Sequence, residues 1–75
     1  MRIHYDPRAD ALYLKFQEGV ARRTKKVEEG VLVDLDGNGR LYGIEIIGMR
    51  GRIPIPELGK ILVAFPTPGT TPAPA

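Results

Sequence analysis

Hydrophobic and polar residues alternate along most of this chain with a period of two. In residues 11–16, Leu12, Leu14 and Phe16 point to one side of an extended strand and the residues between them point to the other. The same segment has fair helix propensity, so a helix is the competing interpretation. The position of Phe16 and the nearby Gly19 favour the strand.

The first residues of the chain predict a short strand of the same kind. Ile3 and Tyr5 lie on one side of it, and Asp6 and Pro7 end it, because proline removes a backbone donor and favours a turn. Asp6 can accept hydrogen bonds from the backbone of that turn, and Asp10 can cap or close it. Asp6, Pro7 and Asp10 are therefore predicted to have structural roles in a turn.

A hairpin is the clearest local prediction. Residues 22–28 form one strand, and after a turn at Glu29 and Gly30 residues 31–35 form the next, with strongly β-branched, alternating side chains. The return strand is expected at residues 40–47. The tight turn before it consists of Asp36, Gly37, Asn38 and Gly39, which are residue types that adopt positive φ at low cost.

The pattern changes after residue 52. Residues 56–63 predict a short helix that begins at Pro56, although Gly59 inside it costs about 1 kcal/mol relative to alanine. Residues 60–65 can also be interpreted as a last strand. We favour the helix, because a sheet with one apolar face needs a cover and no other segment remains to supply it. Residues 66–75 carry four prolines and no charge, and are predicted to be a flexible tail.

These elements predict a single small domain over residues 1–65. Its fold class is mostly β or α+β, an antiparallel meander of four to five strands with one short C-terminal helix. Tyr42, Ile44 and Ile46 are expected on one face of the return strand. The predicted core consists of Ile3, Leu12, Leu14, Phe16, Val31, Val33, Leu35, Ile44 and Ile46.

Composition narrows the chemistry. The chain has 75 residues, 43% of them hydrophobic, and a formal charge of +2. It contains neither cysteine nor serine, which excludes disulfides, thiolate metal sites and the two commonest nucleophiles. Because these nucleophiles are missing, we expect no enzymatic activity.

No apolar run approaches the roughly 20 residues that span a bilayer, and no signal-peptide pattern is present. We therefore expect a cytoplasmic protein without a membrane partner.

Two patterns suggest a metal site. Residues 34–45 satisfy the EF-hand calcium-loop pattern, with Gly39 at its sixth position and Glu45 at its twelfth. That loop lies between helices, whereas here strand-like segments flank it and a hairpin would carry Glu45 away from the ion. His4 is the only histidine and has no second ligand at a suitable spacing. We therefore predict no metal and no other cofactor.

Basic residues form the other candidate site. Strand alternation sends Arg22 and Lys26 to one face and Arg23 and Lys25 to the other, and basic residues on an edge strand also prevent aggregation. The alternative is a strip that contacts nucleic acid phosphates. The candidate contacts are Arg22, Arg23, Lys25, Lys26, Arg50 and Arg52.

A family resemblance covers about residues 1 to 50. It rests on Ile3, Tyr5, Asp6, residues 10–14, Gly30, Val31, Val33, Asp34, Asp36 and residues 43–46, which keep the order and spacing of the family's motifs. The chain is similar to the small prokaryotic family called domain of unknown function 2283. The resemblance implies a compact β-rich domain with no established activity, cofactor or catalytic residue. Members of such families are sometimes one half of a toxin and antitoxin pair, an association that suggests an antitoxin-like role.

Size leads to the functional hypothesis. For about 65 ordered residues without disulfide or metal, apolar burial and ordering entropy nearly cancel, and self-association is the simplest source of further stability. We therefore expect a homodimer that buries apolar side chains of an uncovered face or sheet edge. The leading hypothesis is a non-enzymatic interaction module that pairs with itself or with a small partner protein. The alternative is a nucleic-acid-binding protein that uses the basic strand at residues 22–26.

Overall fold

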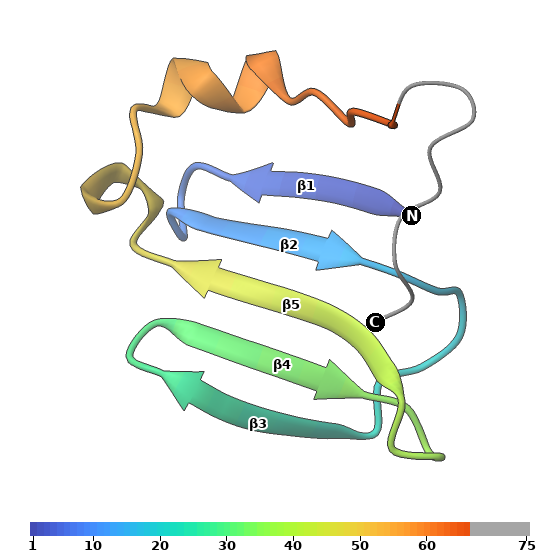
Figure 1. The fold of residues 1–75 in the computed structure, drawn as a ribbon. Helices are drawn as coiled ribbons and strands as arrows, with labels where there is room; N and C mark the ends of the chain where they lie inside the picture. The colour runs from blue at the N-terminus through green and yellow to red at the C-terminus, as the bar shows by residue number, and fades with distance from the viewer. Residues whose placement is uncertain (67–75) are drawn as a thin grey trace.

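Five strands form one antiparallel sheet in the computed structural model, which describes residues 1–66 (Figure 1). This confirms the mostly β fold class and the predicted antiparallel pairing. The strands are β1 (Arg2–Asp6), β2 (Ala11–Lys15), β3 (Arg23–Glu28), β4 (Val31–Leu35) and β5 (Leu41–Ile47). Two 3-10 helices follow, η1 (Met49–Gly51) and η2 (Ile55–Lys60).

The order of strands in the sheet is β1-β2-β5-β4-β3. Strands β1 and β2 pair consecutively, and so do β3, β4 and β5, but β2 does not pair with β3, so the sheet is not the continuous meander predicted from the sequence. Residues 16–22 connect the two runs along one end of the sheet and place β3 at the far edge (Figure 1). The two runs are joined where β2 pairs with β5, so β5 is the central strand.

The turn between β4 and β5 is built around Asp36. Its Oδ1 accepts hydrogen bonds from the amides of Asn38 and Arg40, at 2.9 and 3.0 Å. Its carbonyl accepts from the amide of Gly39, whose φ of +77° is the left-handed conformation that glycine adopts without strain. The hydrogen bonds to the carboxylate, first from the Arg40 amide and then from the Gln17 side chain and the Asn38 amide, hold the pKa of Asp36 below its usual value.

The side chains of the sheet separate into two faces. The register places two rows of hydrophobic side chains on one of them, which we call the apolar face. One row contains Ile3, Leu14, Ile44 and Val33, and the other contains Tyr5, Leu12, Ile46 and Val31. We call the opposite side the polar face.

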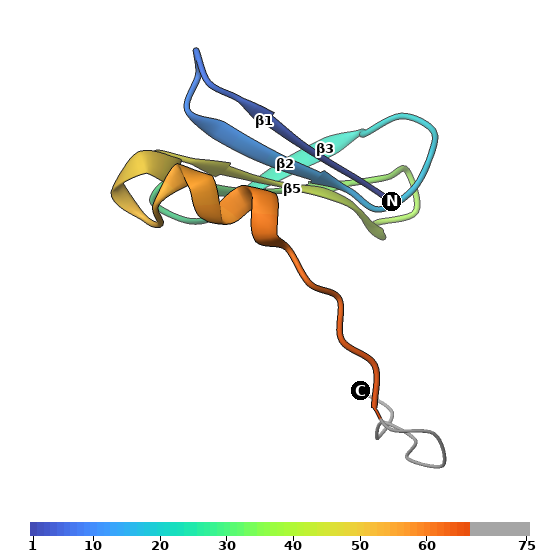
Figure 2. The same ribbon diagram turned by 90° about the horizontal axis from the view of Figure 1, so that it is seen from above.

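Burial on the apolar face is lower than the sequence predicts. Of the nine predicted core residues only Leu12 is buried; Ile3 and Phe16 are exposed, so their assignment to the core is wrong, and the others are half-buried. The reason is that residues 1–66 supply no second layer over most of the sheet, which Figure 2 shows as a single layer. The other buried hydrophobic residues in this part of the chain are Ala11, Tyr42 and Met49.

The position of Tyr42 corrects another expectation. Asp34 is opposite Gly43 while Leu35 is opposite Leu41, so Tyr42 is an extra residue in β5, a β-bulge. The bulge interrupts the alternation and places the Tyr42 ring beside Lys15, with Nζ 5.8 Å from the ring centroid. Tyr42 therefore lies on the polar face. Strict alternation predicts it on the same face as Ile44, and that prediction is wrong.

The predicted helix at residues 56–63 is wrong in length and type. The structure has a 3-10 helix that ends at Lys60, and Ile61 is already extended. Pro54, Pro56 and Gly59 leave too few good helix formers for an α-helix. Helix η2 buries none of its residues and lies beside β1, so it does not cover β5, β4 or β3 (Figure 1).

Residues 61–66 are extended and lead away from the sheet (Figure 2). They do not form the alternative last strand either. The predicted tail at residues 66–75 lies outside the described residues except for Pro66. Within residues 1–66 no helix has the length and apolar character needed to cross a membrane.

Candidate functional site

Asp10 links the two ends of the region that carries the family resemblance. It follows the β1–β2 turn with a φ of +52°, a left-handed conformation that aspartate tolerates better than most residues. Its carboxylate accepts hydrogen bonds from the Tyr5 hydroxyl at 2.7 Å and the Arg50 amide at 3.1 Å. Its carbonyl accepts from the amides of Gly48 and Met49. Asp10 therefore ties the first hairpin to the end of β5.

These contacts make folding depend on the charge of Asp10. The Tyr5 hydrogen bond, followed by the Arg50 amide and charge, holds the pKa of the carboxyl below its ordinary value of 3.8. The ionised form therefore stabilises the fold above the unfolded-state pKa, and this contribution is lost as the pH falls through the folded-state pKa.

We expect Asp10→Asn to lower the urea midpoint of unfolding at neutral pH. At a pH well below 3.8 the decrease should be smaller, because Asp10 of the parent chain is then also neutral. Asparagine keeps the tolerance for positive φ, so the variant tests the charge. Asp36 titrates in both proteins and cancels in the comparison. A difference in midpoint that is the same at both pH values would contradict this assignment.

A second tyrosine and aspartate pair crosses the polar face. The Tyr13 hydroxyl donates to Asp34 Oδ2 and the Thr24 hydroxyl donates to Asp34 Oδ1, both at 2.6 Å. The Tyr13 ring lies against the backbone of Gly43, where any Cβ would be within 2.6 Å of Tyr13 Cζ. Burial, and then the bond to Asp34, raise the pKa of Tyr13. This network links β2, β4 and β3 across the central strand.

Sequence reasoning missed both pairs. It assigned Asp10 to a turn but gave no partner to either tyrosine. The only signal was Gly43, a glycine inside a predicted strand, which often marks the close approach of another group. Each oxygen of Asp34 accepts one of these hydrogen bonds, so the network acts as a structural link between the strands.

The six basic residues proposed to contact nucleic acid do not form one patch. Arg50 donates to the Pro7 carbonyl at 3.0 Å, and Arg52 donates to the carbonyls of Ile47 and Glu29 at 3.1 and 2.9 Å. These two arginines therefore hold the turns at one end of the sheet. Arg22 and Arg23 are at the other end of β3.

Two more of the basic residues lie on opposite faces of β3. Lys25 is opposite Val33 at the margin of the apolar face. Lys26 is on the polar side and forms an ion pair with Glu29 at 2.7 Å. All six residues of β3 are exposed, as expected for an edge strand. The strand therefore presents a short and divided set of cations.

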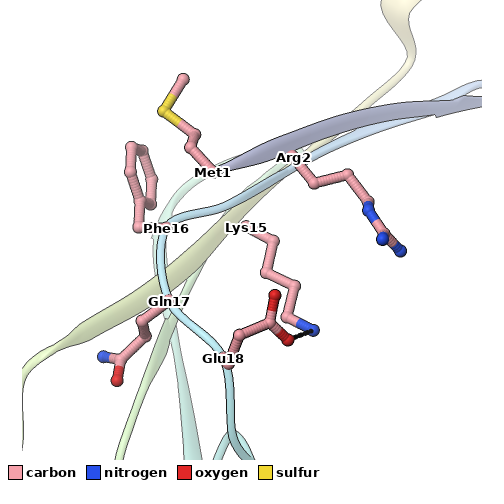
Figure 3. A pocket seen from close by; sticks show the side chains of 6 residues that line it. All are labelled: Met1, Arg2, Lys15, Phe16, Gln17 and Glu18. Atoms are coloured by element: carbon pink, nitrogen blue, oxygen red, sulfur yellow. Dashed lines mark hydrogen bonds and ion pairs between the residues drawn. The ribbon is translucent and has the colours of Figure 1, made fainter.

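A polar cavity of about 300 Å³ lies where β1 begins and β2 ends. Figure 3 shows the side chains that line it. Met1 and Phe16 extend to one side of the strands, while Arg2, Lys15 and Glu18 lie on the other, with Lys15 paired to Glu18 at 3.3 Å. The side chains shown do not converge on a common point.

The calcium-loop pattern and His4 give no metal centre in the described part of the chain. Within residues 1–66 no three histidine, aspartate or glutamate side chains lie close enough together to hold an ion. Asp36 Oδ1 accepts two amide hydrogen bonds in the hairpin turn, and Glu45 lies on β5 opposite Tyr13. His4 is exposed on the edge strand β1. The residues that match the calcium-loop pattern form the β4–β5 hairpin.

The apolar face stands out among the described surfaces because its side chains are mostly aliphatic. Val31, Val33, Leu35, Ile44 and Ile46 are all half-buried, and they lie on β4 and β5, beyond the edge that η2 flanks. A contiguous apolar surface that its own chain leaves uncovered often marks a site of interaction. We therefore take this face as the candidate functional site.

Comparison with known proteins identifies the family. No curated protein and no solved structure matches the chain. One family model matches residues 2–50, a segment that contains all five strands and ends at Arg50, which binds Asp10. The match covers more than half of the chain and agrees with the resemblance of the sequence motifs. The chain belongs to the family described as protein of unknown function (DUF2283).

Proposed function

We propose that this protein is a non-enzymatic interaction module that associates with itself through the apolar face of its sheet. One observation carries the proposal: β5 and β4 place half-buried aliphatic side chains on a face that residues 1–66 leave without a second layer. Burying such a face under a second layer is how β proteins form their cores. A second copy can supply that layer, and symmetry then covers the face of both copies.

The edges of the sheet support the same choice. Strand β3 carries Arg23, Lys25 and Lys26, and pairing two such edges would bring like charges together. Helix η2 flanks the other edge, at β1 (Figure 1). Association through the apolar face avoids both obstacles. A small partner protein with an apolar surface, as in an antitoxin-like role, is the other occupant that this face would accept.

We expect light scattering at micromolar concentration to give about twice the 8.3 kDa mass of one chain. We also expect the melting temperature to rise with protein concentration, because only the folded state associates. A mass near that of one chain, together with a melting temperature that does not change with concentration, would refute self-association.

The same sample tests the alternative function. Purification at low ionic strength retains nucleic acid if the exposed cations of β3 bind phosphates, and raising the salt concentration releases it. We expect no such nucleic acid, because Arg50 and Arg52 are engaged within the fold and the remaining cations are divided between two faces. Nucleic acid that is retained at low salt and released at high salt would favour the alternative.

A further inference from the structure

The most hydrophobic exposed segment of the described chain lies directly after η2. Residues 61–65 contain Ile61, Leu62, Val63 and Phe65 around Ala64, with no charged or polar side chain. Leu62 and Phe65 are 83% and 84% exposed, more than any other large hydrophobic residue in this part of the chain. We call residues 61–65 the C-terminal apolar segment.

This segment makes no use of its own sheet. It leads away from the strands (Figure 2), and its backbone is already extended, with φ −66° and ψ 125° at Ile61. Isoleucine, valine and phenylalanine all favour extended structure on an apolar surface. The segment thus has the conformation and composition of a docking strand without a surface to dock on.

The same molecule has an uncovered apolar face of complementary chemistry. From the exposed segment and the open face we infer that two copies exchange their C-terminal apolar segments, each segment packing on the β5–β4 part of the other copy's apolar face. This inference rests on the proposed self-association and names the part of the chain that mediates it. The exchange is reciprocal, so it closes as a symmetric dimer and does not extend into a filament.

The alternative docking surface on the same sheet fits less well. Pairing with the outer edge of β3 would place the uncharged segment beside Arg23, Lys25 and Lys26. Packing on the apolar face buries aliphatic side chains from both surfaces.

The test compares aspartate substitutions at equally exposed valines. Val63 lies in the segment and Val20 lies in the β2–β3 connection, and each is 65% exposed. We expect Val63→Asp or its neighbour Leu62→Asp to raise the dimer dissociation constant at least ten-fold, since one of two adjacent positions must face the sheet. Val20→Asp is the control and should leave the constant unchanged. Sedimentation equilibrium of the full-length chains measures it.

The outcomes separate this inference from the proposed function. If the parent chain dimerises and neither substitution in the segment weakens the dimer, the segment exchange is wrong while self-association stands. If the parent chain is a monomer throughout the concentration range, self-association fails and the exchange fails with it.

Cross-linking locates the segment on the partner. The chain has no cysteine, so a Val63→Cys chain mixed with a Val33→Cys chain can form a disulfide between positions 63 and 33 only by joining two molecules. We expect that mixed disulfide, and we expect Val20→Cys in place of Val63→Cys to give none. A disulfide that forms only when both cysteines are on one chain would show that the segment folds back on its own sheet, and would overturn the exchange.

Discussion

Gly43→Ala should destabilise the protein by about 3 kcal/mol, because overpacking and the loss of a charged hydrogen bond both contribute. A Cβ at this position would be 2.6 Å from Tyr13 Cζ and 2.8 Å from Tyr13 Cε1. The ring cannot remain in place, and moving it breaks the bond from Tyr13 to Asp34. Urea unfolding followed by circular dichroism measures the change.

Two comparisons assign the effect to the ring. In a Tyr13→Ala background the same Gly43→Ala substitution should cost much less, so the double-mutant cycle should show strong coupling. Gly59→Ala, where no heavy atom lies within 4 Å of the new Cβ, should have little effect. Equal costs of Gly43→Ala with and without the Tyr13 ring would contradict the proposed packing.

Gly30→Ala should have the next largest effect. Gly30 adopts a φ of +77°, and a Cβ there would also lie 2.6 Å from Arg52 Nη2 and 3.1 Å from the Ile47 carbonyl oxygen. The left-handed conformation alone costs about 1 to 2 kcal/mol for alanine. Displacing Arg52 from the Glu29 carbonyl should add about 1 kcal/mol more.

Gly39 offers a matched control for Gly30. It has the same φ of +77° and no heavy atom within 4 Å of a new Cβ. Gly39→Ala should therefore show the conformational cost without the contacts. Thermal or urea unfolding of the two variants gives the difference in stability. This difference should become smaller when Arg52→Ala is added to both, because only the contact with the Ile47 carbonyl then remains. Equal destabilisation by Gly30→Ala and Gly39→Ala would mean that Arg52 does not stabilise this turn.

The strands were predictable because their signals are local. The alternation of Leu12 and Leu14 marks β2, and the turn at Asp36 marks the hairpin that follows β4. The pairing of β2 with β5 was not predictable in the same way, because nothing in either strand specifies a partner about 30 residues away. The position of Tyr42 depends on a one-residue bulge that alternation cannot show.

The candidate site was predictable only in part. The sequence identified aliphatic side chains such as Val33 and Ile44 as one face of a sheet, and it predicted that this face needs a cover. It assigned the cover to a helix at residues 56–63, which the structure replaces with a shorter one beside β1. The hydrogen bonds of Asp10 and Asp34 join residues far apart in the chain and depend on the register of the whole sheet.

The crossover from β2 to β3 makes the length of one connector decisive. Residues 16–22 must pass the ends of β5 and β4, three interstrand spacings of about 4.8 Å, or roughly 14 Å in all. Seven extended residues reach about 24 Å, whereas four would reach about 14 Å and leave nothing for turning at either end. A shorter connector would force β3 to pair beside β2, and the chain would then fold as an uninterrupted ladder of hairpins with a different central strand.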